Sequence, residues 1–96
     1  ENYPDSPLSA SVVIAKGNAY EGLGEIKKAA RAYLNSFSLY EDSPVAPEAL
    51  TLLGNALVSL GQTGAGCQTL AQVLIRFPGS DFSLDAEKMM SELQCP

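Results

Sequence analysis

Apolar residues recur along this chain at intervals of three and four positions, which places them on one face of an α-helix. No stretch shows the alternation of β-branched and polar residues that is typical of a strand. The pattern therefore predicts an all-α chain. The recurring apolar positions are Val12, Val13, Ala15, Ala19 and Tyr20; Ala29, Ala30, Tyr33, Leu34 and Phe37; Leu50, Leu53, Leu57 and Leu60; and Leu70, Val73, Leu74 and Phe77.

Cap and turn residues divide this pattern into five helices. In Ser6-Pro7 and again in Ser43-Pro44, the serine can cap a helix and the proline fits the first helical position. Gly24 and Gly61 can adopt the left-handed conformation that ends a helix. The predicted helices cover about residues 7–23, 25–40, 44–60, 63–77 and 82–94.

The same landmarks return 37 positions later. Tyr3-Pro4-Asp5-Ser6-Pro7 reappears as Tyr40-Glu41-Asp42-Ser43-Pro44 and, less exactly, as Phe77-Pro78-Gly79-Ser80-Asp81. Gly17-Asn18-Ala19 likewise maps onto Gly54-Asn55-Ala56, and Leu23-Gly24 maps onto Leu60-Gly61. The chain is therefore interpreted as one domain over residues 1–96. It would hold two helix-hairpin repeats, at about 7–40 and 44–77, and a terminal helix at about 82–94.

Two glycines lie inside predicted helices at this repeat distance, Gly17 and Gly54. A glycine within a helix costs about 1 kcal/mol relative to alanine. The repetition of that cost predicts a packing reason, namely a neighbouring helix that crosses too closely for any larger side chain.

These features resemble the tetratricopeptide repeat (TPR) family. Gly17-Asn18-Ala19-Tyr20 and Leu53-Gly54-Asn55-Ala56 match the small-residue segment of the family's first helix. Pro78 stands where a repeat-ending proline is usual, although Glu41 takes that place in the first unit. The unit of 37 residues is longer than the family's usual ~34. The resemblance implies a TPR-type α-α superhelix with a C-terminal capping helix.

Within that family, the turn segments between the helices resemble those of the periplasmic Tol-Pal system proteins YbgF/CpoB. The matching segments are Tyr3 to Pro7, Asp42 to Gly54, and Gly66 to Leu70 leading to Phe77-Pro78-Gly79-Ser80. This resemblance implies a non-enzymatic adaptor that binds TolA and coordinates peptidoglycan synthesis with outer-membrane constriction in cell division. The start at Tyr3-Pro4 looks like the end of an earlier repeat. BamD, an outer-membrane assembly scaffold, has similar turn segments and is the alternative relative.

Composition narrows the classes of function. The 96 residues carry a net charge of −5, which disfavours nucleic-acid binding, and no apolar run approaches a membrane span. The chain has no histidine, so Ser-His-Asp and Cys-His catalysis and most zinc sites are excluded. The glycines lack the spacing of a phosphate-binding loop. We expect no catalytic residues, no metal and no cofactor.

The two cysteines are Cys67, near the start of the fourth predicted helix, and Cys95, at the end of the fifth. Antiparallel neighbouring helices bring these ends together. The pattern favours a disulfide, which needs an oxidising compartment and agrees with a periplasmic location. The alternative is a pair of free buried thiols.

Stacked helix pairs curve, and the first helix of each pair lines the inner surface. The predicted partner-binding groove has eight residues, and its amides Asn18 and Asn55 can clamp a peptide backbone. The alternative is that these asparagines are solvated. Lys27, Lys28 and Arg31 form a basic edge, either solvated or a patch for an acidic partner. The groove residues are Ser11, Ile14, Asn18, Glu21, Glu48, Thr51, Asn55 and Val58.

The leading hypothesis is a peptide-binding adaptor with a TolA-like protein partner. The alternatives are a BamD-like assembly scaffold and a structural self-association module. Self-association would use the apolar face at the start of the first helix, formed by Leu8, Val12 and Val13.

Overall fold

The computed structural model describes residues 7–96, and the side chains from Ser9 onward. Its helices are α1 (Pro7–Gly22), α2 (Ile26–Leu39), α3 (Ala46–Ser59), α4 (Thr63–Arg76) and α5 (Asp81–Leu93). No strand occurs within residues 7–96. The all-α prediction is confirmed, and most helix ends fall within one or two residues of those expected.

The turns inside the two hairpins have the same geometry. Gly24 and Gly61 adopt positive φ angles of 81° and 86°, so the predicted left-handed helix ends are confirmed. The N–H of Glu25 donates to the Tyr20 carbonyl, and the N–H of Gln62, 37 positions later, donates to the Leu57 carbonyl, both at 2.9 Å. These bonds satisfy carbonyls that the helix end leaves without a partner.

The predicted start of the third helix at Ser43-Pro44 is wrong by two residues. Ser43 and Pro44 lie in a turn, where the Ser43 hydroxyl oxygen accepts from the N–H of Val45 at 3.1 Å. The carbonyl of Ser43 accepts from the N–H of Ala46 at 3.0 Å, and α3 then begins with Pro47 in its first turn. Pro47 therefore takes the early helical position expected for Pro44. The predicted cap Ser6 lies outside the described residues.

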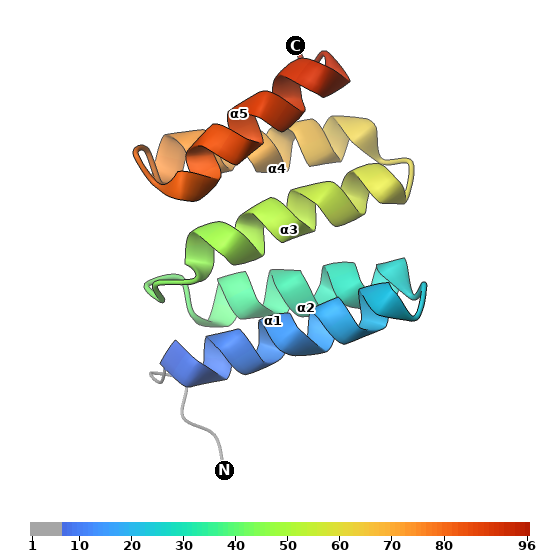
Figure 1. Cartoon of the computed structure of the whole chain (residues 1–96), viewed down its shortest axis with the longest axis vertical. Coiled ribbons are helices and arrows are strands. Elements are labelled where there is room, and N and C mark those ends of the chain that lie inside the picture. Colours follow the sequence, from blue (N-terminus) through green and yellow to red (C-terminus); the bar gives the residue numbers. More distant parts are fainter. Residues whose placement is uncertain (1–6) are drawn as a thin grey trace.

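Consecutive helices run antiparallel and form two layers (Figure 1). In that view α1, α3 and α5 form the nearer layer, and α2 and α4 lie behind them. The described chain measures 43 × 31 × 16 Å, so the helices stack along one axis rather than close into a bundle. Helix α5 packs on α4 and also reaches α3.

The core consists of small side chains around a few large ones. Tyr33, Leu70 and Val73 are completely buried. The rings of Phe37 and Phe77 meet edge to face with their centres 6.3 Å apart, and so join α2 to the end of α4. Small residues let the helix backbones approach closely around these side chains. The fully buried alanines are Ala29, Ala49, Ala56 and Ala86.

The expected close helix crossings are present in both hairpins. A Cβ atom added at Gly17 would lie 2.5 Å from Cε1 of Tyr33, and one added at Gly54 would lie 2.8 Å from Cδ2 of Leu70. Leu70 follows Tyr33 by 37 positions, as Gly54 follows Gly17. The two hairpins therefore use one packing scheme, with a glycine on the first helix facing a large residue on the second.

Candidate functional site

The predicted pairing of Cys67 with Cys95 is confirmed. The two residues form a disulfide, with their Cα atoms 5.7 Å apart. Gln94 takes a left-handed conformation, and the N–H of Cys95 donates to the Met90 carbonyl at 2.9 Å, which turns the chain end back toward α4. The bond fastens the end of α5 to α4. Disulfides of this kind persist in oxidising compartments.

A polar network connects the first helix of the chain to the buried Tyr33 of α2. The Tyr33 hydroxyl oxygen lies 2.7 Å from Oδ1 of Asn18 and 2.5 Å from Oε1 of Glu21. One hydroxyl has one proton to donate, and the Glu21 carboxylate can only accept. Tyr33 therefore donates its proton to Glu21. The Asn18 amide is then assigned with its NH₂ group toward Tyr33, so that it donates to the hydroxyl oxygen.

This network affects the acid–base behaviour of Tyr33. Burial, followed by the hydrogen bond to Glu21 and the negative charges of Glu21 and Glu48, raises the pKa of the Tyr33 hydroxyl above its ordinary value. The hydroxyl stays protonated and keeps its role as a donor. Glu21 from α1 and Glu48 from α3 thus both exert their negative charge on the same phenol group.

Two of the eight predicted groove residues are buried, which corrects the proposed lining. Ile14 is 5% exposed and Thr51 is 4% exposed. Each precedes the helical glycine of its own hairpin by three positions, so it shares the face that packs on the hairpin's second helix. The Thr51 hydroxyl is also occupied, because it donates to the Pro47 carbonyl at 2.8 Å.

Val58 lies on this inward face as well. A Cβ atom added at Gly66 of α4 would come 2.5 Å from a methyl carbon of Val58, so the valine packs against α4 and is half-buried. The remaining predicted positions reach the surface to different extents. Ser11, Asn18 and Glu21 are exposed, and Glu48 and Asn55 are half-buried.

The two helical layers differ in charge, which sequence reasoning missed. The helices α2 and α4 carry no acidic residue and four basic ones. The helices α1, α3 and α5 carry six acidic residues and two basic ones, Lys16 and Lys88. This separation appears only once helices distant in sequence are assigned to layers. The acidic residues are Glu21, Glu48, Asp81, Asp85, Glu87 and Glu92.

Little of this charge is neutralised by ion pairs. In the part of the chain from residue 7 onward, the structure records one ion pair, between Arg76 and Glu41 at 3.4 Å. The Arg76 guanidinium also lies over the ring of Phe37, 5.0 Å from its centre. Glu21, Glu48 and Asp81 form no ion pair with any lysine or arginine of residues 7–96. The acidic layer therefore remains available to attract a cationic partner.

The self-association face expected on the first helix is only partly described. The side chain of Leu8 lies outside the described residues. Val12 is 66% exposed, whereas Val13 is half-buried. The expected apolar face is therefore represented in the described residues mainly by Val12.

Residues 7–96 show neither a cluster of metal ligands nor a membrane-spanning helix. No group of three or more cysteine, aspartate and glutamate side chains gathers there as a metal site would require. No helix in that range has the length and apolar character needed to cross a membrane.

Neither the models of known protein families nor the curated proteins contain a match to this chain.

Proposed function

We propose that this chain is a TPR-type adaptor domain that binds a segment of another protein and has no catalytic role. The observation that carries the proposal is the repetition of one packing scheme at a distance of 37 residues. Gly17 faces Tyr33 in the first hairpin, and Gly54 faces Leu70 in the second. Hairpins that repeat in this way stack side by side and present an extended surface to partners.

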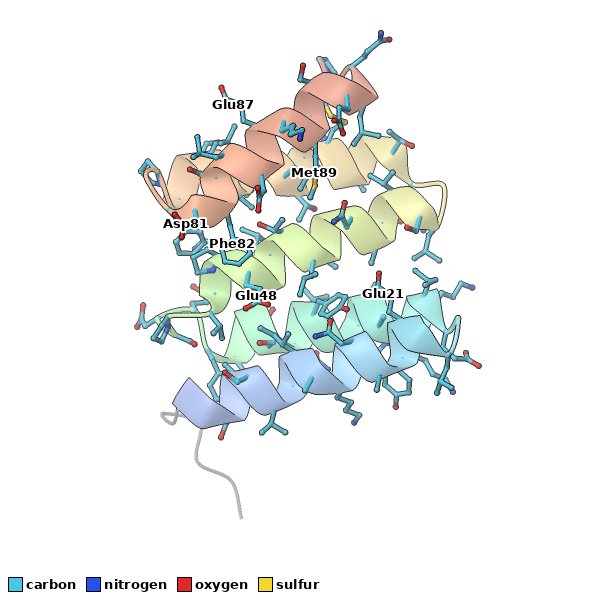
Figure 2. All side chains as sticks on the ribbon, in the orientation of Figure 1. Glu21, Glu48, Asp81, Phe82, Glu87 and Met89 are labelled. Carbon is cyan, nitrogen blue, oxygen red and sulfur yellow. A yellow bond between two sulfur atoms is a disulfide. The ribbon has the colours of Figure 1, made fainter. Side chains whose placement is uncertain are left out.

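The binding surface in this proposal is the layer formed by α1, α3 and α5. It carries the exposed Asn18, the half-buried Asn55 and the acidic side chains that lack ion pairs in the described chain. Figure 2 shows Glu21 and Glu48 on this layer together with Phe82 and Met89 of α5. Amide and carboxylate groups beside partly buried apolar side chains suit a basic peptide segment with an apolar anchor.

The resemblance to YbgF/CpoB supplies the proposed setting. The chain would act in the periplasm, bind TolA and contribute to envelope constriction during cell division. The Cys67–Cys95 disulfide supports an oxidising compartment of this kind.

Isothermal titration of the chain with the periplasmic region of TolA tests the proposal. We expect saturable one-to-one binding that weakens as salt rises, because the acidic layer would contribute to the attraction. Light scattering of the chain alone at several concentrations measures its oligomeric state. Absence of heat with TolA would overturn the proposed partner, and a concentration-dependent oligomer without TolA binding would favour the self-association module.

A further inference from the structure

The first hairpin carries a hollow that the adaptor function does not use. It has a volume of about 240 Å³ and lies between α1 and α2. Every polar side chain of residues 9–96 that lines it can donate a hydrogen bond, and no aspartate or glutamate of that range lines it. The Lys28 ammonium lies 5.8 Å from the centre of the Tyr20 ring. The lining residues are Lys16, Tyr20, Lys28, Arg31, Ala32 and Asn35.

The positive charge of this hollow is not balanced within the described chain. Three of the chain's six basic residues line it, although the net charge of the whole chain is −5. Lys16, Lys28 and Arg31 form no ion pair with any acidic residue of residues 7–96. Three cations that share one hollow repel each other, and a bound anion would relieve that repulsion.

The second hairpin shows that this charge is not part of the repeat. The positions 37 residues further on hold uncharged side chains throughout, and the equivalent of Lys16 is Leu53, which is buried in the core. The first hairpin therefore carries basic side chains at positions where the second carries none. The equivalent residues are Leu53, Leu57, Ala65, Gln68, Thr69 and Gln72.

We propose that the hollow binds a phosphate group. Arg31 offers a planar fork of N–H donors that matches two phosphate oxygens, while Lys16 and Lys28 supply two further charges. The Tyr20 hydroxyl and the Asn35 amide add neutral donors to the same space. Because the chain as a whole is acidic, it does not attract anions generally, so any phosphate binding has to be local.

Phosphate of this kind can come from a free phosphate compound or from a phospholipid headgroup, and two probes distinguish them. The first probe is pyrophosphate, titrated into ¹⁵N-labelled chain and followed by amide chemical shifts. The second is a phosphatidylglycerol vesicle, tested by co-sedimentation beside a phosphatidylcholine vesicle. We expect pyrophosphate to shift amides around Lys16, Lys28 and Arg31 and to saturate.

Paired variants make the test specific. Lys28→Ala with Arg31→Gln replaces two lining residues by those of the second hairpin, both at exposed positions of α2. The control, Lys27→Ala with Lys88→Ala, removes the same charge from exposed residues that do not line the hollow. We expect the first pair to weaken pyrophosphate binding at least about tenfold and the control to change it little.

Each result decides the proposal. Vesicle binding that is lost with Lys28→Ala/Arg31→Gln and kept in the control assigns the phosphate to a lipid headgroup, whereas pyrophosphate binding alone assigns it to a free compound. The proposal is overturned if neither probe binds, if the shifts fall outside the hollow, or if both variant pairs lose binding equally.

Discussion

Gly54 and Gly66 face each other where α3 crosses α4. A Cβ atom added at Gly66 would lie 3.0 Å from the carbonyl oxygen of Gly54, and one added at Gly54 would lie 3.5 Å from the carbonyl oxygen of Gly66. The position at Gly54 would also come 2.8 Å from two side-chain carbons of Leu70, which is completely buried. The crossing therefore has no room for a side chain on either helix.

We predict that Gly54→Leu lowers the free energy of unfolding by at least about 2 kcal/mol, because the added side chain must displace a buried leucine. For a chain of this size, that corresponds to a fall in Tm of about 10 °C or more, measurable by circular dichroism. An unchanged Tm would contradict the close crossing.

Gly64→Ala provides the matched control on α4. Gly64 is exposed, and a Cβ atom placed there would meet no atom of the described chain within 4 Å. Alanine also restricts the unfolded chain more than glycine does. We expect this variant to raise stability by up to about 1 kcal/mol. Destabilisation by both variants would show a general intolerance of α3 and α4 to substitution rather than a specific crossing.

The repeat and the helix periodicity predicted these crossings because both are local properties of the sequence. Gly17 and Gly54 inside otherwise good helices indicated where the backbones approach, and Gly24 and Gly61 indicated where the helices end. The disulfide followed from the antiparallel order of neighbouring helices.

The spacing of apolar residues alone could not give the rotation of each helix about its axis. Spacing of three and four fixes which residues share a face, but not which face is buried. Ile14 and Thr51 were therefore assigned to the surface although they lie on the inward face. The helical glycine three residues later was the available signal, since it indicates the side of closest contact.

The basic hollow and the acidic layer lay beyond sequence reasoning for a different reason. The sequence predicted one basic edge, formed by Lys27, Lys28 and Arg31. In the structure only Lys28 and Arg31 line the hollow, together with Lys16 of another helix. Such groupings depend on how α1 and α2 are set against each other.

We predict that Tyr33→Phe lowers the free energy of unfolding by about 1 kcal/mol at pH 7. The variant keeps the buried ring and removes only the hydroxyl that bonds to Glu21 and Asn18. Chemical denaturation of both proteins measures the difference. A difference near zero would mean that water replaces the network without cost.

The stability difference should also depend on pH. The raised pKa keeps the Tyr33 hydroxyl protonated in the folded chain, whereas the unfolded chain loses this proton above its ordinary value of 10.0. The folded chain then holds one more proton than the unfolded chain, so the free energy of unfolding falls as pH rises. We expect the advantage of the parent protein over Tyr33→Phe to be constant from pH 7 to 9. Above pH 10 it should shrink by up to about 1.4 kcal/mol per pH unit. A constant difference up to pH 11 would contradict the raised pKa.

We predict that removal of the disulfide loosens α5 before the rest of the chain. A bond between residues 28 apart stabilises by about 3–4 kcal/mol on the chain-entropy model. Cys67→Ala with Cys95→Ser should lower overall stability by about that amount and speed hydrogen exchange most for the amides of α5. The amides of α1 and α2 are the internal control. Equal acceleration throughout would show that α5 unfolds only with the whole domain.

The disulfide can also be tested chemically, by a comparison of the parent protein with the double variant. Thiol titration of the unreduced parent should find no free cysteine, and addition of a reductant should destabilise the parent but leave the double variant unchanged. Two reactive thiols in the unreduced parent would contradict the bond and remove its support for an oxidising compartment.

The two asparagines of the proposed binding layer differ in their hydrogen bonds, and this difference gives the last prediction. The Asn18 side chain is hydrogen-bonded to Tyr33, whereas the Asn55 side chain forms no hydrogen bond with any described residue of 7–96. We expect Asn55→Ala to weaken TolA binding about five- to tenfold with unchanged Tm, and Asn18→Ala to weaken binding and also lower Tm. The double variant should bind more weakly than either while it keeps its helical content. Gln72→Ala, an exposed amide on α4 in the opposite layer, is the control and should bind as the parent does. If Gln72→Ala weakened binding and the asparagine variants did not, the partner would dock on α2 and α4 instead.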